Sequence, residues 1–377
     1  MNTKQLLFTL IGLSAFKINA QNWKGSLETQ SGYEFNILKN PKTLEIEDEL
    51  MNRDDLWQNS FYQDVNGYVS YTYKASKNKL RWNASTRNRL YFEQQDFNRY
   101  KFTTALNYQF KSSEVGHTRW ETDLEFQIKE QNIINNDEAF LRTPFSYKRY
   151  TLTTGLHFRP IKQNRTYLEV GFIHKDYDPT ETRDFQYNAL TAMLETKNVF
   201  WSNHKLHKYG VILNYQNRIY DERSLTGANI TNRKWQYISG TAFYEFPITK
   251  QWSVEPEFSI MKRNDNTTQG NASYFQWSPT LSTSYKTGDW KLKARVGYRN
   301  RVYNDLQANT NEGLLTENIQ YDYFTAYVDL ERRLNKNLFL TLTASSINRD
   351  SNQTAVTSTA FRSYENHYIG LGLKWGF

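Results

Sequence analysis

Apolar and polar residues alternate along most of the chain from Trp23 onward. In the segment 119–129, one face carries Trp120, Leu124 and Phe126, and the opposite face carries only polar or charged residues. This period of two predicts a β-strand with one apolar and one polar face. A strand of a soluble β-sandwich also alternates, so repetition and length have to decide between the two classes.

The same alternation recurs in the segments 100–110, 252–260 and 290–299. Runs of about 10 to 13 residues have the length that a tilted strand needs to cross the hydrocarbon core of a membrane. Strands of soluble proteins average only about five or six residues. The length of the runs therefore favours a transmembrane β-barrel.

About sixteen such runs can be placed, and about fourteen or eighteen remain open because the runs near Thr166 and Phe185 are the least regular. They begin near Trp23, Phe61, Lys79, Arg99, Arg119, Arg149, Thr166, Phe185, Leu206, Lys234, Trp252, Phe275, Trp290, Gln320, Leu338 and Arg362. Short connections, such as 75–78 and 286–289, alternate with longer polar ones at 37–56, 130–144, 221–232, 304–318 and 349–360. The pattern predicts an all-β, antiparallel up-and-down transmembrane barrel with short periplasmic turns, longer outer loops and both termini on the periplasmic side.

Tryptophan and proline positions add local expectations. Trp57, Trp235 and Trp277 fall near the outer ends of runs, where an interfacial aromatic belt is expected. Pro256 and Pro279 fall inside runs, and each lacks the N–H that a β-ladder needs. A β-bulge is therefore expected at each proline.

Composition fits this fold once the barrel is considered. A mean hydropathy of −0.79 describes a polar chain, and no stretch reaches the roughly 20 apolar residues that a membrane helix needs. Aromatic residues nevertheless make up 16% of the chain, and cysteine is absent. In a membrane barrel only alternate residues face lipid, and aromatic girdles mark its two interfaces. The absence of cysteine excludes disulfides and thiolate metal sites.

The first twenty residues have the pattern of a secretory signal peptide. Lys4 supplies a positive start, residues 6–16 form an apolar run, and Ala20 suits the position before cleavage. We therefore expect residues 1–20 to be a signal peptide and residues 21–377 to form one barrel domain. The formal net charge of +8 could suggest a nucleic-acid partner, but export to the cell envelope argues against one.

The last residues carry the most specific pattern. Leu371, Leu373, Trp375 and Phe377 alternate with small or polar residues, and the chain ends at the aromatic Phe377. This resembles the terminal strand that the barrel assembly machinery of the outer membrane recognises. By this resemblance the chain is similar to bacterial outer-membrane β-barrel proteins of porin-like size. It implies outer-membrane lipid and the assembly machinery as partners, with these four residues as the assembly signal.

No catalytic, metal or cofactor site is expected. The six histidines do not form a metal-binding pattern, and no glycine-rich phosphate loop or nucleophile motif is present. We therefore expect no cofactor and no enzymatic activity, although barrel enzymes that act on lipid or peptide form a third class to be tested.

Charged residues on the polar face are the candidate functional groups. With the apolar face in lipid, the following would line the lumen: Lys79, Arg81, Arg87, Arg89, Lys101, Glu121, Asp123, Glu125, Glu255, Glu257, Lys291, Lys293, Arg295, Arg299 and Arg301. In a barrel of about sixteen strands, those eight apart are opposite, so basic walls would face acidic walls across a wet pore. Neighbouring charges could instead pair and fill the lumen with a salt-bridge network, and the sequence leaves both arrangements open.

Two functions follow from these arrangements. The first is a porin-like passive channel for small hydrophilic solutes, with mild anion preference from the basic lumen. The alternative is a non-conducting barrel subunit of an outer-membrane secretion, assembly or surface complex, using loops such as the acidic 37–56. Whether the barrel forms a homo-oligomer or binds another partner stays open at this level.

Overall fold

The computed structural model describes residues 22–112, 118–131, 146–179, 183–202, 204–224, 230–267, 271–358 and 362–377. The expected signal peptide and most of the expected outer loop 130–144 lie outside the described residues. Within the described ranges, no helix has the length and apolar character needed to cross a membrane.

Sixteen long strands of the described chain make up one closed sheet. They are β1 (Trp23–Phe35), β4 (Ser60–Ala75), β5 (Asn78–Tyr91), β6 (Arg99–Lys111), β7 (Arg119–Gln131), β8 (Tyr147–Phe158), β9 (Asn164–Tyr177), β10 (Arg183–Ser202), β11 (Lys205–Ser224), β13 (Lys234–Pro247), β14 (Trp252–Asp265), β15 (Tyr274–Thr287), β16 (Trp290–Thr310), β17 (Gly313–Arg333), β18 (Leu338–Ser351) and β19 (Tyr364–Gly376). A two-residue strand, β12 (Ile230–Thr231), adds to the end of β11. The strand count and fold class predicted from the alternation are confirmed.

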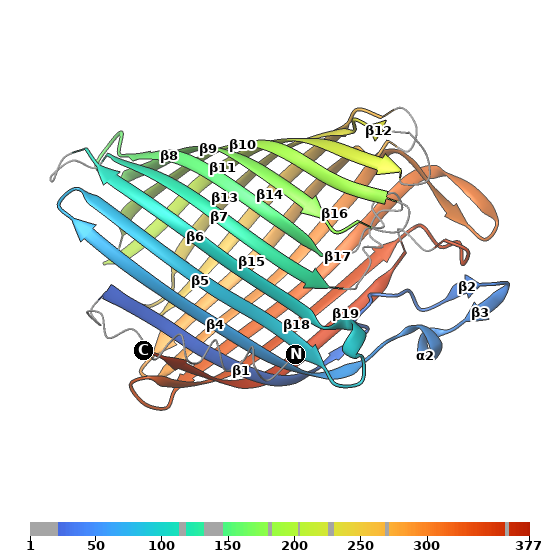
Figure 1. Ribbon diagram of the computed structural model, residues 1–377, viewed down its shortest axis with the longest axis horizontal. Helices are drawn as coiled ribbons and strands as arrows, with labels where there is room; N and C mark the ends of the chain where they lie inside the picture. The colour runs from blue at the N-terminus through green and yellow to red at the C-terminus, as the bar shows by residue number, and fades with distance from the viewer. Residues whose placement is uncertain are drawn as a thin grey trace.

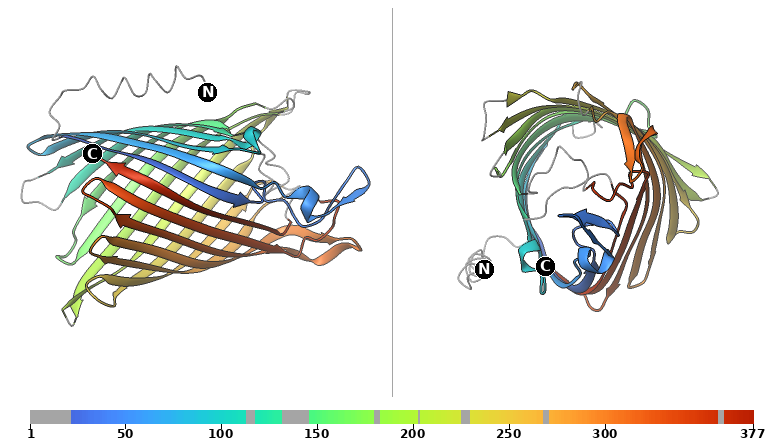
Figure 2. Two further views of the ribbon diagram at one scale, coloured as in Figure 1. Left: turned by 90° about the horizontal axis from the view of Figure 1, so that it is seen from below. Right: turned by 90° about the vertical axis from the view of Figure 1, so that its right-hand side faces the viewer.

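Each long strand pairs antiparallel with its neighbours in the sequence, and β1 also pairs with β19 to close the barrel. Ser26 lies opposite Gly376 and Phe35 lies opposite His367 at this closure, which we call the seam. Figures 1 and 2 show the tilted strands and the ring that they form in end view. The chain enters β1 and leaves β19 at the end of the barrel where the short turns lie, which we call the periplasmic end (Figure 1).

The alternation in the sequence becomes the two faces of the wall. Apolar residues such as Leu124, Phe258 and Leu371 lie on the outward face and are about half exposed. Polar residues such as Gln127 and Asn107 lie on the inward, concave face and are nearly buried. Side chains converge on a concave surface and spread apart on a convex one, which explains why the polar face has less exposed area.

The outer end contains a connection with its own structure. Residues 37–56 form a small hairpin, β2 (Leu44–Ile46) and β3 (Glu49–Met51), followed by the helical turn α2 (Arg53–Leu56). The hairpin projects beyond the rim in side view and lies within the outline of the ring in end view (Figures 1 and 2). A hydrogen bond from the Arg362 guanidinium to the Thr43 carbonyl and an ion pair between Lys42 and Glu365, 2.6 Å apart, fix its base.

The predicted outer loop 304–318 is wrong. β16 and β17 continue as a paired hairpin to the turn at Gly313, whose φ of +121° suits a glycine. Register shifts between Val302 and Gln307 disturb the alternation that the sequence would otherwise show. Ala308 and Ile319 are buried in an apolar cluster with Tyr274, and this packing holds the extension in place.

The bulges expected at the two prolines are also absent from the described pairing. Pro256 lies opposite Leu281 and Pro279 lies opposite Phe258, and the register between β14 and β15 continues unchanged. On their other sides, pairs are missing next to each proline, but the register is the same before and after the gap. Each proline therefore removes ladder hydrogen bonds without requiring an extra residue.

Candidate functional site

The inward face of the barrel wall is the candidate functional site, and contacts that skip a strand identify it. Arg89 on β5 reaches Glu34 on β1 across β4, with 2.7 Å between Nη1 and Oε2. Lys374 on β19 reaches Glu331 on β17 across β18, with 3.2 Å between Nζ and Oε2. Such contacts occur between side chains that converge on the concave face.

The predicted lumen residues all fall on this face. Strand register places Lys79, Arg81, Arg87, Arg89, Lys101, Glu121, Asp123, Glu125, Glu255, Glu257, Lys291, Lys293, Arg295, Arg299 and Arg301 at inward positions. Because the strands follow one another around the ring, β5 and β14 are eight strands apart, as are β7 and β16. The basic residues of β5 and β16 therefore lie on walls opposite the acidic residues of β14 and β7.

Part of this charge is neutralised locally. Glu121 accepts hydrogen bonds from Asn107 and Gln109 and lies 3.0 Å from Arg119 Nη2. Arg149 donates to Glu125 over 2.5 Å, and Lys291 lies 3.7 Å from Glu331. For these groups the second arrangement that the sequence left open, pairing between neighbouring charges, is therefore present.

Other cations lie beside like charges. Arg87 is directly opposite Lys101 on the neighbouring strand, and Lys101 is directly opposite Lys129. We call these three residues the basic row. Like charges directly opposite across a sheet destabilise it. Within the described part of the chain, neither Arg87 nor Lys101 has a carboxylate within ion-pair distance.

The sequence did not predict the layer of stacked arginine and tyrosine side chains in the outer half of the lumen wall. The Arg263 guanidinium lies 4.3 Å from the ring of Trp235 and 4.4 Å from that of Tyr274. Arg349 stacks in the same way on Tyr321, at 4.6 Å. Arg263 and Arg349 also donate to the backbone carbonyls of Ala272 and Arg362. Tyrosines at inward positions near the outer ends of the runs were the available signal for this layer.

Trp235 therefore does not belong to the outer belt that the sequence predicted, because it is inward and 2% exposed. Trp57 is also buried, within the 37–56 segment, where its indole N–H donates to the Pro41 carbonyl. Trp277 lies on the outward face, with its ring 5.3 Å from that of Tyr298.

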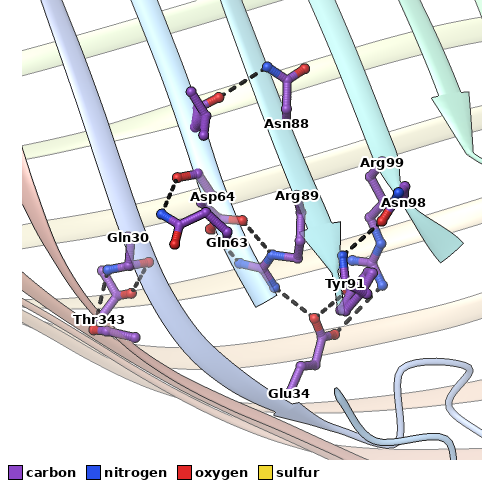
Figure 3. A network of polar contacts seen from close by, with 12 residues as sticks. Gln30, Glu34, Gln63, Asp64, Asn88, Arg89, Tyr91, Asn98, Arg99 and Thr343 are labelled. Carbon is purple, nitrogen blue, oxygen red and sulfur yellow. Dashed lines mark hydrogen bonds and ion pairs between the residues drawn. The ribbon is translucent and has the colours of Figure 1, made fainter. Parts of the chain in front are cut away.

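A buried polar network joins strands on both sides of the seam, and Figure 3 shows its part on β1, β4 and β5. The Glu34 carboxylate accepts hydrogen bonds from Arg89, from the Tyr91 hydroxyl at 2.6 Å and from the Asn366 amide at 3.1 Å. Arg89 also donates two hydrogen bonds to Asp64, both 2.8 Å long. Buried charges are stable only when they are paired and hydrogen-bonded, and this network meets both conditions.

Glycines complete the inward surface of the seam. The ring of Tyr62 lies over Gly32 and Gly370, and a Cβ at Gly370 would stand 2.4 Å from the Tyr62 hydroxyl. Gln30 lies beside it and donates to the Gly370 carbonyl over 3.3 Å. The absence of Cβ atoms on β1 and β19 therefore creates the recess that holds the Tyr62 ring. We call Gly32, Gly370 and Tyr62 the seam notch.

The outward face forms an apolar belt that surrounds the sheet. Of the residues predicted as the assembly signal, Leu371, Leu373, Trp375 and Phe377 all lie on this belt and are between 44% and 54% exposed. Trp120, Trp252 and Trp290 occupy outward positions near its periplasmic end. A closed sheet satisfies its own backbone hydrogen bonds, which a structure in lipid must do. The structure is that of a transmembrane β-barrel.

Comparisons with known proteins add little beyond this fold. No family model and no curated protein matches the chain. Among solved structures, a bacterial polysaccharide outer membrane secretin is similar with a TM-score of 0.48 and 8% identity, over 94% of this chain and 98% of that one. The outer membrane channel DcaP of Acinetobacter baumannii gives a TM-score of 0.46 and 11% identity, over 94% and 96%. OpdO of Pseudomonas aeruginosa gives a TM-score of 0.42 and 10% identity, over 95% and 97%.

The described wall offers no metal centre, because no three His, Asp or Glu side chains in those ranges are arranged to hold an ion. His157 contacts Arg119 and Glu121, and His174 contacts Asn188 on the outward face. Outside the membrane-spanning strands, a hydrogen bond from the Ser60 hydroxyl lowers the pKa of the Glu93 carboxyl in the connection 92–98. These contacts stabilise the local structure around each group.

Proposed function

We propose that the barrel is a porin-like passive channel for small hydrophilic solutes with a mild preference for anions. The size of the ring supports this function, because barrels of about 16 strands leave an aqueous channel whereas those of about 8 strands are filled by side chains. The basic row gives the strongest support for this function.

Arg87 and Lys101 of the basic row support a wet lumen for an electrostatic reason. Unpaired charges in a dry interior cost several kcal/mol each, about as much as the whole stability of many domains. Water or a passing anion removes most of that cost by solvating the cations. A lumen filled with salt bridges would not place Arg87 of β5 directly opposite Lys101 of β6 with no carboxylate within ion-pair distance of either among the described residues.

Conductance in a planar bilayer tests the proposal. We expect the wild-type protein to form channels that favour anions, and the variant Arg87→Gln with Lys101→Gln to lose most of that preference while still conducting. Lys336→Gln removes the same kind of charge from the exposed periplasmic turn and serves as the control. The difference should shrink between about 0.1 M and 1 M salt, because the screening length falls from about 10 Å to about 3 Å.

Two results would contradict the proposal. Unchanged selectivity in a conducting double variant would place the basic row outside the permeation path. Absence of conductance in the wild type would favour the alternative function, a barrel subunit of a surface, secretion or assembly complex. The hairpin at 44–51 supports that alternative, because it projects beyond the rim and exposes Ile46 and Leu50 among acidic residues.

The seam also bears on how the barrel is assembled. We propose that the barrel assembly machinery recognises β19, whose outward residues end at Phe377. Phe377 and Gly25 exchange two backbone hydrogen bonds of 3.0 Å, so the last residue is already part of the closure.

A further inference from the structure

A cavity of about 420 Å³ lies at the periplasmic end of the wall, where β6 to β10 begin or end. Its charged lining side chains are Lys111, Arg119, Arg159, Arg165, Lys197 and Glu195. Its aromatic lining residues are Tyr167, His157 and Phe158. We call this cavity the periplasmic pocket. Its volume falls within the range of about 300–1,000 Å³ that is usual for small-molecule sites.

The charge of the periplasmic pocket is strongly unbalanced. Among the described lining residues, Glu195 has the only carboxylate, and this group already forms an ion pair with Lys197. Lys111 lies directly opposite Arg119, and Arg165 lies directly opposite Lys197. Among the described residues, Lys111 and Arg165 have no carboxylate within ion-pair distance. Two cross-strand pairs of like charge therefore meet at one cavity, an arrangement that a bound anion would stabilise.

The aromatic surface of the pocket is held in one orientation. The rings of His157 and Tyr167 are stacked, with centroids 4.0 Å apart and planes 13° from parallel. A Cβ at Gly155 would lie 2.5 Å from the Tyr167 ring, so only glycine there lets the ring lie flat on the wall. The Tyr167 hydroxyl donates to Glu169 over 2.6 Å. These contacts give the cavity a fixed boundary.

The side chain of Arg119 has the hydrogen-bond donor that most directly indicates a bound ligand. Its Nη2 lies 3.0 Å from Glu121, but its buried Nε has no hydrogen-bond partner in the described structure. A guanidinium N–H that is buried without an acceptor is destabilising. An anion in the pocket would supply that acceptor.

We infer that the periplasmic pocket binds the phosphate group of a small phosphorylated solute. Guanidinium groups match phosphate oxygens with paired N–H donors, and the pocket offers three of them, on Arg119, Arg159 and Arg165. A phosphate carries close to two negative charges at neutral pH, which suits a site with several unpaired cations. Phosphate binding at this periplasmic mouth does not depend on conduction through the lumen.

Equilibrium dialysis of the purified full-length barrel in detergent, with labelled inorganic phosphate in about 50 mM salt, tests the inference. We expect saturable binding at one site per chain. Arg165→Gln and Lys111→Gln should each raise the phosphate Kd about tenfold or more, since a hydrogen bond to a charged group contributes about 1.5–3 kcal/mol. Lys250→Gln removes a cation from a periplasmic turn outside the pocket and should leave the Kd unchanged.

Heat-modifiable gel mobility of every variant establishes that the barrel is folded before binding is measured. Binding that does not saturate, or a Kd that is the same in Arg165→Gln and in the wild type, would overturn the inference. An equal loss in Lys250→Gln would do so as well, because it would show a general response to net charge. A barrel that binds phosphate and does not conduct would contradict the channel proposal alone.

Discussion

Replacing Gly370 by alanine should weaken the closure of the barrel, because the new methyl group would enter the seam notch. A Cβ at this position would lie 2.4 Å from the Tyr62 hydroxyl oxygen and 2.8 Å from the Gln30 side-chain carbonyl carbon. Gly32→Ala is a more severe change at the same notch. Its Cβ would lie 2.1 Å from the backbone carbonyl oxygen of Ile369 and 2.6 Å from the Tyr62 ring.

The nature of the opposing atoms sets the size of each effect. Overpacking costs about 1–3 kcal/mol, and alanine recovers about 0.4–1 kcal/mol by restricting the unfolded chain. Gly370→Ala meets the ends of side chains that can shift, so we expect a net loss of about 1 kcal/mol. Gly32→Ala meets backbone, which cannot move without breaking the β1–β19 ladder, so we expect a loss of about 3 kcal/mol or more.

The substitution Tyr62→Phe distinguishes the effect of Gly370→Ala from that of Gly32→Ala. The Tyr62 hydroxyl is buried and has no hydrogen-bond partner among the described residues, so its removal alone should be neutral or slightly stabilising. It also removes the closest contact of Gly370→Ala and should recover most of the stability that this variant loses, because only the flexible Gln30 side chain then remains within 3.0 Å of the new methyl group. It leaves the Ile369 carbonyl in place and should not rescue Gly32→Ala.

Urea titration of the barrel in phospholipid vesicles, followed by tryptophan fluorescence and heat-modifiable gel mobility, measures the wild type, the three single variants and the two double variants that combine Tyr62→Phe with each glycine substitution. The midpoint should fall slightly for Gly370→Ala, fall far for Gly32→Ala, and recover only for Gly370→Ala with Tyr62→Phe. Equal midpoints for the two glycine variants, or rescue of both by Tyr62→Phe, would refute the proposed packing of the seam notch.

Two further predictions concern the faces of the wall and its last residue. Leu124→Arg places a cation on the lipid face and should lower the free energy of unfolding by about 2–4 kcal/mol. Thr153→Arg places a cation on the lumen face opposite Asp123 and should be tolerated. Equal losses of stability in urea titration would mean that the two faces are reversed. Deleting Phe377 removes its two backbone hydrogen bonds to Gly25 and the terminal aromatic ring, so the amount of folded barrel in the outer membrane should fall on immunoblots of membrane fractions; a wild-type amount would show that assembly does not depend on this residue.

The fold could be predicted from the sequence because strand pairing in this barrel is local. Each strand pairs with the next one along the chain, and the period of two fixes which residues face lipid. The predicted strand starts at Arg99, Arg119, Lys234, Trp252, Trp290 and Leu338 coincide with those of the structure. The prediction failed at 304–318, where the hairpin lies beyond the apolar belt and lipid no longer imposes alternation on its sequence.

The sequence alone determined the barrel fold, the face of the wall on which the charged residues lie, and the terminal strand. All three follow from residues that are close to one another in the chain. The tertiary structure alone decided which charges are neutralised. Closure brings Asn366 within 3.1 Å of Glu34, although 332 positions separate them in the sequence. The convergence of side chains on a concave wall also lets Arg89 reach across an intervening strand. Hydrogen bonds and ion pairs depend on distances of a few ångströms, and a one-dimensional pattern does not contain the curvature that sets those distances.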